Sequence, residues 1–303
     1  MRFRKYSRKH AFNILYQWDI TGEDLDRLNE EYWENLENSY RLASSVAENL
    51  KNLIEKQKDF DIEVFSKKFE TLADEEILAD KLRGKLFAVY LLLRAVEDFH
   101  NFALTYTGWI SEKAKPKLEK AFSILSEIEN SLEKLQKIEI DSKEDLEKLL
   151  KFVRDLRENP PKDFDTLKEA EREFRQRVLQ VVKTFLEEIK EFSSKRVEED
   201  LGEIREYAQK LLKVYKDHKI EVDSTIEEFL EDWTLDSLGS IERNLLRLGT
   251  TEFVHVGVQD PGRAFNDYID FAKAFVGKKA AKFVNGVLSA IYNKRVAGSK
   301  RKD

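Results

Sequence analysis

Cationic side chains gather at the two ends of this 303-residue sequence, where they could bind phosphate groups. The first ten residues contain no acid and five cations: Arg2, Arg4, Lys5, Arg8 and Lys9. A second set, opposed only by the terminal Asp303, includes Lys273, Lys278, Lys279, Lys282, Lys294, Arg295, Lys300 and Lys302. The net charge of the whole chain is −6, so the middle must carry the acidic excess. An even spread of this charge would argue against nucleic acid, whereas the uneven distribution leaves the two ends suited to a polyanion.

The N-terminal cations belong to a predicted helix over residues 6–19, in which Ser7 is the expected N-cap and Arg8 and Lys9 fall in the first turn. The helix dipole disfavours cations there by about a few tenths of a kcal/mol, and a bound phosphate would reverse that cost. Backbone N–H groups at a helix start form an anion site with flanking cations. Four cations would then make salt-dependent phosphate contacts: Arg4, Lys5, Arg8 and Lys9. A basic end that only improves solubility explains the same residues equally well.

A second candidate site lies in the stretch KFVNGVLSAIYNK, residues 282–294, which has the spacing of an amphipathic helix. At about 100° per residue, Phe283 falls at the edge of the apolar face, with Lys279 and Lys282 on the adjoining polar side. Unpaired RNA bases stack on such aromatic rings at roughly 1–3 kcal/mol per base, while nearby cations hold phosphates. The spacing alone favours core packing of Phe283 over this RNA contact.

The dipeptide Asn285-Gly286 is usual in turns, yet it lies inside this predicted helix. A glycine within a helix costs roughly 1 kcal/mol relative to alanine, so Gly286 requires a reason. The usual reason is the close approach of another backbone, and we therefore expect tight packing on a neighbouring helix. For Asn285 we expect the role of a buried hydrogen-bonding anchor, with a polar contact as the alternative.

The composition excludes several classes of chemistry. The sequence has no cysteine, which rules out disulfides, thiolate metal sites and thiol nucleophiles. Its histidines are scattered without the spacing of metal ligands, and neither a metal nor a cofactor is predicted: His10, His100, His218 and His255. No apolar stretch is long enough for a bilayer, and no signal-peptide pattern follows the basic N-terminus. We therefore expect a cytoplasmic protein without a membrane partner.

The composition predicts an all-α protein, because charged residues make up 37% of the sequence and it contains only four prolines and eleven glycines. Long charged helices are expected at about 24–58, 81–105, 117–138, 143–157 and 164–192. Turn signals at Thr107-Gly108, Lys115-Pro116 and Pro160-Pro161 indicate helical hairpins, and the apolar stripes of 117–138 and 164–192 are expected to face each other. The charges between 39 and 199 suit solvated helix faces, not a catalytic constellation.

From about residue 203 the pattern changes to shorter helices in a compact bundle: EIREYAQKLLKVY, DSTIEEFLEDW, SIERNLLRLGTTEFVHV, FNDYIDFAKAFV and AAKFVNGVLSAIYNK. Together with RKHAFNILYQWD at residues 8–19, these segments resemble the family of transcription antitermination factor NusB, in the same order along the chain. The segment KFVNGVLSAIY is the most specific of these motifs.

Residues from about 39 to 199 have no counterpart in the family that the sequence resembles. The resemblance therefore implies a NusB-like helical bundle core, residues 1–38 and 200–303, interrupted by an inserted, charged helical-hairpin subdomain, residues 39–199. A partial internal duplication leaves this boundary open, because residues 39–61 are similar to residues 206–223.

The resemblance implies a non-enzymatic factor that binds the boxA element of nascent ribosomal RNA transcripts, together with the small-subunit ribosomal protein NusE. The resemblance further implies that the complex with boxA RNA and NusE is loaded onto RNA polymerase for antitermination. The implied RNA-binding residues are Arg4, Lys5, Arg8, Lys9, Lys279, Lys282 and Phe283, and Gly286 would leave room for the RNA strand. Asp236 and Glu242 are implied at the NusE interface, where they suit a basic partner, although the helix dipole alone also favours acids at a helix start.

Two other functions compete with this interpretation. The acidic insertion could make the protein an interaction module in which RNA binding is blocked or replaced, but the basic residues at both ends argue against it. Some ribosomal RNA methyltransferases begin with a NusB-like domain, but this chain has no glycine-rich cofactor loop after a strand and no catalytic cysteine. Arg243, Arg247 and Glu252 are as compatible with intramolecular ion pairs as with partner contacts.

Overall fold

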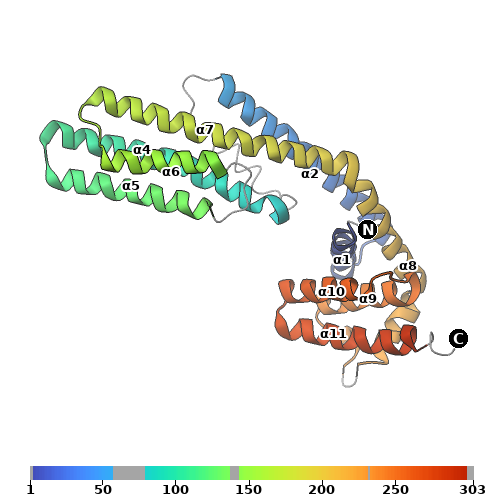
Figure 1. The fold of residues 1–303 in the computed structure, drawn as a ribbon. Helices are drawn as coiled ribbons and strands as arrows, with labels where there is room; N and C mark the ends of the chain where they lie inside the picture. Colours follow the sequence, from blue (N-terminus) through green and yellow to red (C-terminus); the bar gives the residue numbers. More distant parts are fainter. Residues whose placement is uncertain (1–2, 57–78, 137–142, 231–232, 299–303) are drawn as a thin grey trace. The chain divides into compact units, whose positions relative to one another are not determined.

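A computed structural model describes residues 3–56, 79–136, 143–230 and 233–298, and all regular secondary structure in these ranges is helical (Figure 1). This confirms the predicted all-α fold class. None of the described helices is both long and apolar enough to cross a bilayer. Several predicted features lie outside the described residues, namely Arg2, Lys300, Lys302, Asp303 and the helix ends expected near 58 and 138.

Contacts divide the chain into two compact units, which we call the core unit (Met1–Glu37 with Val197–Asp303) and the central unit (Asn38–Arg196). Each unit has its own set of packed helices. The predicted division of function between an RNA-binding core, 1–38 and 200–303, and an insertion, 39–199, stays a prediction.

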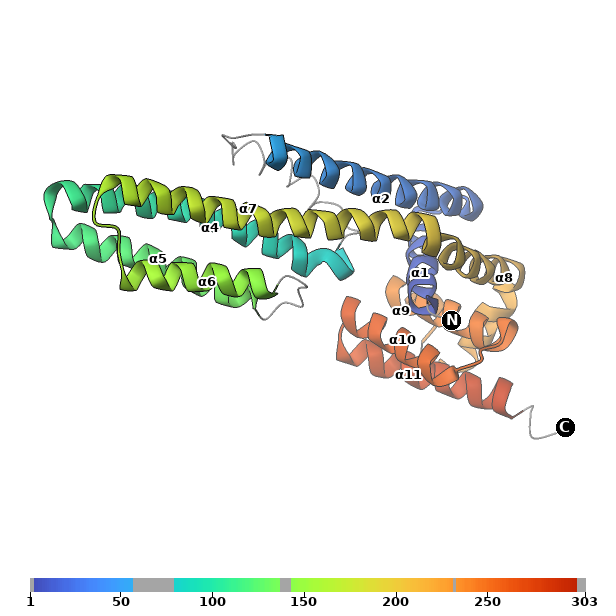
Figure 2. The ribbon, with the colours of Figure 1, turned by 45° about the horizontal axis from the view of Figure 1, so that its top comes forward.

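The core unit is a bundle of helices. Its elements are α1 (Arg4–Thr21), the start of α2 (Leu25–Lys56), α8 (Leu201–Glu227), η3 (Leu235–Ser237), α9 (Ser240–Thr250), η4 (Thr251–Val256), α10 (Pro261–Phe275), α11 (Lys278–Tyr292) and η5 (Asn293–Ala297). Helix α1 packs on α8 and α9, and α9, α10 and α11 pack on one another, as Figure 2 shows from a second side. Apolar residues at helical spacing form these contacts, and Ile14, Leu15, Leu245, Val284 and Leu288 are fully buried.

The close approach between helices in the core unit occurs at Gly249 and not at Gly286. A Cβ atom at Gly249 in α9 would lie 2.7 Å from the side chain of Leu288 in α11, whereas one at Gly286 would meet nothing within 4 Å. The predicted tight packing at Gly286 is therefore wrong. The predicted burial of Asn285 is also wrong, because this residue is exposed and its Oδ1 accepts a hydrogen bond from Ser289 Oγ at 3.3 Å.

Helix α1 begins earlier than predicted. It starts at Arg4, and the Ser7 hydroxyl donates to the carbonyl oxygen of Phe3 at 3.2 Å instead of capping the helix. The first turn therefore holds Arg4 and Lys5, and the prediction that placed the next two cations in that turn is wrong.

Helix α8 joins two segments that the sequence analysis separated, 203–215 and 223–233. The helix continues through the expected break, and its one residue with non-helical dihedral angles is His218, at φ −115° and ψ 18°. Residues on both sides of this kink are buried, including Tyr215 and Val222.

The central unit contains the rest of α2, α4 (Ala79–Glu112), α5 (Lys115–Leu135), α6 (Lys143–Glu158), α7 (Phe164–Lys195) and the first residue of η2 (Arg196–Asp200). Helices α4 and α6 each pack on both α5 and α7. The predicted apolar stripes of α5 and α7 are buried in one shared core, although α4 and α6 are their main neighbours. The predicted turn at Thr107-Gly108 is wrong, because α4 runs through it to Glu112 and ends before Lys113, which has φ +56°.

Candidate nucleic-acid interface

A cleft of about 760 Å³ lies in the core unit between the start of α1, the middle of α8 and the segment that leads into α10. Five cations line it: Arg4, Lys5, Arg8, Lys210 and Arg263. Two acids, Asp260 and Asp267, also line it, so the charge of the lining side chains is positive. Val256, Gly257, Val258 and Gln259 also line it. A cleft with this balance of charge attracts anions.

Two of the residues predicted to contact phosphate, Arg4 and Lys5, line this cleft from the first turn of α1. The guanidinium carbon of Arg4 is 3.4 Å from the centroid of the Tyr207 ring, a cation–π contact that holds the side chain against α8. The Lys5 ammonium forms an ion pair with Asp270 at 2.8 Å, and both side chains are more than half exposed. The hydrogen bond to Asp270 raises the pKa of Lys5, which keeps this amine charged.

Arg8 occupies a different place from the one predicted for it. Its guanidinium donates through Nε and Nη2 to the two carboxylate oxygens of Glu252, at 2.8 and 2.7 Å, and through Nη1 to Asp267 Oδ2 at 2.6 Å. Both Arg8 and Glu252 are almost completely buried. The hydroxyls of Tyr207 and Tyr268 also donate to Glu252, at 2.6 and 2.7 Å. Arg8 therefore fixes α1 against η4 and α10, and the direct phosphate contact predicted for it gives way to a positioning role.

The pKa values in this cluster follow from its burial and its pairing. Burial acts to lower the pKa of Arg8, but hydrogen bonds and charge from Glu252 and Asp267 outweigh it and raise the pKa. Burial raises the pKa of Asp267, while Arg8 acts in the opposite direction. Burial and the charge of Glu252 raise the pKa of both Tyr207 and Tyr268. The tyrosines thus stay neutral hydrogen-bond donors and Arg8 stays charged.

The predicted cations of the C-terminal region lie on one exposed face of α11. Lys279 and Lys282 are exposed, and Phe283 is half-buried at the edge of the apolar face, where the spacing placed it. Gly286 is exposed on the same face, with open space beside it. These residues and Lys9, which is half-buried on α1, do not line the cleft. The predicted RNA-binding residues therefore fall into two groups in the core unit, and the structure does not gather all of them in one pocket.

The predicted partner-binding acids lie at the start of α9. Asp236 is exposed in η3, and Glu242 is half-buried in the first turn of α9. The arginines that follow Glu242 make intramolecular ion pairs: Arg243 with Asp19 at 2.6 Å, and Arg247 with Asp19 at 2.8 Å and Asp223 at 3.0 Å. Of the two alternatives left open for Arg243, Arg247 and Glu252, ion pairing within the chain is the one observed.

Lys210 and Arg263 are cleft residues that the sequence analysis missed. Lys210 belongs to α8 and Arg263 to the first turn of α10, and both are exposed. They reach one cleft with Arg4 and Lys5 only because α8 and α10 flank α1 in the folded protein. Asp260 caps the start of α10 and Pro261 follows it, and this N-cap pattern is a sequence signal that could have located Arg263.

The fold and the cleft define an all-helical protein with a cationic surface to which α1, α8 and α10 contribute. The sequence model described as the NusB family matches residues 180–293. The transcription antitermination protein NusB of a Nitratiruptor species is 35% identical over 116 residues, which covers 38% of this chain and 83% of that relative. The chain therefore belongs to the NusB family.

Other relatives match a smaller part of their own length. The transcription antitermination protein NusB of Aquifex aeolicus is 48% identical over 95 residues, which is 31% of this chain and 64% of the relative. That of Persephonella marina is 40% identical over 91 residues, which is 30% of this chain and again 64% of the relative. The chain thus spans just under two thirds of the length of these two relatives.

Solved structures of similar sequence are also known. A crystal structure of antitermination factors NusB and NusE in complex with dsRNA contains a chain that is 41% identical, with 37% of this chain and 79% of that chain covered and a TM-score of 0.30. A solution structure of NusB from Aquifex aeolicus is 42% identical, with 36% of this chain and 76% of that chain covered and a TM-score of 0.29.

Proposed function

We propose that this protein is an RNA-binding transcription antitermination factor, which binds boxA-type single-stranded RNA of nascent ribosomal RNA transcripts together with ribosomal protein NusE. Membership in the NusB family is the observation that carries this proposal. The protein acts by binding and not by catalysis, in the cytoplasm, and the complex that it forms joins RNA polymerase during antitermination.

The cationic cleft and the exposed face of α11 are the proposed RNA-binding surfaces. Arg4 and Lys5, joined by Lys210 and Arg263, hold phosphates at the cleft, because all four cations line it and the last two are exposed. Lys9 adds positive charge on α1. Arg8 supports this surface from inside the protein through its pairs with Glu252 and Asp267.

On α11, Phe283 provides the stacking platform. It is half-buried at the edge of the apolar face of α11, so part of the residue is accessible to RNA. Lys279 and Lys282 lie one turn before it and directly before it, where they can hold the phosphates of a stacked base. The open space beside Gly286 leaves room for the strand.

NusE binds, in this proposal, at the start of α9. Asp236 is exposed there and Glu242 is half-buried, and two carboxylates this close in the chain suit a basic partner. The central unit is an insertion, and its helices are free to serve a further protein partner.

The test is fluorescence anisotropy of a labelled boxA-like single-stranded RNA, titrated with the protein in the presence and absence of NusE. We expect binding that NusE tightens and that Phe283→Ala weakens by the loss of one stacked base, about 1–3 kcal/mol. Phe164→Ala is the matched control, because Phe164 is also partly exposed but lies at the start of α7 in the central unit. Absence of binding in both conditions would replace this proposal with an interaction module whose insertion blocks or replaces RNA binding.

A further inference from the structure

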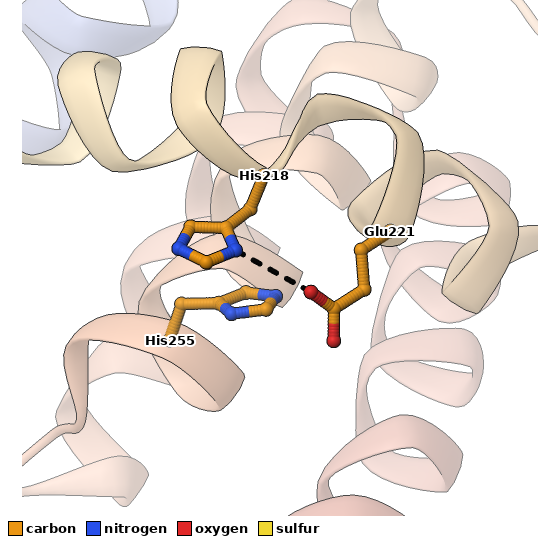
Figure 3. Close-up of side chains that lie close together, drawn as sticks. All are labelled: His218, Glu221 and His255. Atoms are coloured by element: carbon orange, nitrogen blue, oxygen red, sulfur yellow. Dashed lines mark hydrogen bonds and ion pairs between the residues drawn. The ribbon is translucent and has the colours of Figure 1, made fainter.

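Two histidines that are far apart in the sequence meet in the core unit. The rings of His218 in α8 and His255 in η4 stack with centroids 4.3 Å apart and 21° between their planes. Glu221 lies beside them, and its Oε2 is 3.3 Å from His218 Nδ1 (Figure 3). One potential ligand atom from each of the three side chains lies within 4.8 Å of the other two. The expectation that the histidines are scattered does not hold for this pair.

The backbone departs from a regular α-helix on both sides of this cluster. Helix α8 kinks at His218 itself, and Glu221 follows at the three-residue spacing that places two side chains on one helix face. His255 belongs to η4, a π-helical segment, and such segments occur frequently at functional sites. The two irregular segments therefore bring three side chains of metal-ligating type to one point.

One ring nitrogen of His255 lacks a hydrogen-bond partner in the part of the chain that the structure describes. Its Nε2 atom is buried and has no hydrogen-bond partner among the described residues. Figure 3 shows the ring beneath that of His218, with one nitrogen towards the Glu221 carboxylate. Burial lowers the pKa of His255, while the charge of Glu221 acts in the opposite direction. An imidazole nitrogen without a hydrogen-bond partner, close to a second imidazole and a carboxylate, is available to bind a metal ion.

We propose that His218, Glu221 and His255 bind a divalent transition-metal ion, for which zinc is the best match. Two imidazoles and one carboxylate form open zinc sites, with bonds of about 2.0–2.2 Å and a remaining position for water. Calcium and magnesium prefer oxygen ligands and do not suit this set. An ion can enter, because the side chains of His218 and Glu221 are 45% and 64% exposed.

Binding requires only a local adjustment. Ligand atoms around a zinc ion lie roughly 3–3.5 Å apart, so atoms now within 4.8 Å must approach by on the order of 1 Å. Rotation of the two exposed side chains towards His255 supplies this movement. The bound ion joins α8 to η4 and stabilises the core unit, independently of RNA binding.

Isothermal titration calorimetry of the full-length protein, prepared without a polyhistidine tag, tests the site with zinc chloride. We expect one ion per chain, with affinity that falls as the pH is lowered from about 7.5 to 5.5, because the imidazoles must be neutral to bind. His255→Ala and Glu221→Gln should each weaken binding by about tenfold or more, since a site with three protein ligands then loses one. His100→Ala is the control, because His100 pairs with Glu171 in the central unit.

Thermal unfolding gives a second readout. Zinc should raise the melting temperature of the wild type and of His100→Ala, but not that of Glu221→Gln. Glu221 is exposed, so this variant tests the site even if His255→Ala fails to fold. The proposal is overturned if zinc shows no saturable binding below millimolar concentration, or if Glu221→Gln binds it as tightly as the wild type.

Discussion

At the scale of single residues, the buried cluster around Glu252 sets the position of the cationic surface. Glu252 accepts hydrogen bonds from Arg8, Tyr207 and Tyr268, which come from α1, α8 and α10. The sequence showed that Arg8 was one of several N-terminal cations, but it could not show that a carboxylate 244 residues later would face it. The sequence shows how many cations lie near the N-terminus, but only the tertiary fold shows which of them is buried and which is exposed.

Arg8→Ala should destabilise the core unit by about 3–5 kcal/mol, because it leaves Glu252 buried without its counter-charge. Lys5→Ala is the comparison, since it removes a solvent-exposed ion pair with Asp270 and should cost about 0–1 kcal/mol. Urea unfolding followed by circular dichroism measures both. Equal losses of stability in the two variants would mean that the Arg8 cluster does not hold α1 in place.

Asp19 gives the stability of the core unit a dependence on acid pH. Burial acts to raise the pKa of Asp19, but hydrogen bonds from Arg243, Arg247 and Asn244 outweigh this and lower the pKa below its ordinary value. A carboxyl with a lowered folded-state pKa stabilises the protein above its unfolded pKa, and this contribution disappears as the pH falls through the folded value. Asp19→Asn should therefore be less stable than the wild type at neutral pH, and the difference should shrink below about pH 4. Urea titrations from neutral to acid pH measure the difference in free energy of unfolding between the two proteins. A difference that stays constant over this range would contradict the stabilising role of the Asp19 carboxylate.

At the scale of helices, periodicity predicted most of the elements, and errors occurred where local signals compete with packing. Thr107-Gly108 is a turn signal, yet α4 continues because its neighbours Phe102 and Tyr106 are fully buried. The opposite error concerns Gly286, where the sequence suggested a close helix contact that belongs instead to Gly249. A glycine within a helix suggests that a neighbouring group comes close, but the sequence does not show which glycine faces such a neighbour and which faces open space.

These two glycines provide a matched pair of substitutions. Gly249→Ala should destabilise the core unit by about 1–3 kcal/mol, because the new methyl group overlaps the fully buried Leu288. Gly286→Ala should stabilise it by up to about 1 kcal/mol, because alanine is the better helix former and the site is open. The melting temperatures of both variants, compared with that of the wild type, test these expectations. A lower melting temperature for Gly286→Ala would show that Gly286 has a packing role.

At the scale of the whole molecule, the chain contains two packed units, and only the core unit carries the proposed RNA-binding residues. The resemblance to the NusB family pointed to the core from motifs at both ends of the chain. The cleft itself could not be predicted, because Lys210 and Arg263 join Arg4 and Lys5 only in the folded bundle. The metal-ligand cluster was equally hidden, since a kink in α8 and a π-helical segment bring its residues together.

Removal of the central unit should leave RNA binding intact. The two ends of this unit lie close together, because Ser44 and Ser194 are hydrogen-bonded at 3.0 Å and the rings of Tyr40 and Phe192 are in contact. A short glycine-serine linker in place of residues 38–196 should therefore be enough to join the core segments. Circular dichroism checks folding and anisotropy checks binding. A folded deletion variant that binds RNA much more weakly, or more tightly, would give the central unit a direct role in binding.

The most direct measurement of the central claim is the salt dependence of RNA affinity. Log affinity of boxA-like single-stranded RNA should fall linearly with log salt, and Lys282→Ala should reduce the slope by about 0.7, the value for one lost phosphate contact on a single strand. Lys168→Ala, which removes an exposed lysine of α7 in the central unit, should leave the slope unchanged. If the wild type binds with no salt dependence, or if both variants keep its slope, the cationic surface of the core unit is not the RNA-binding site.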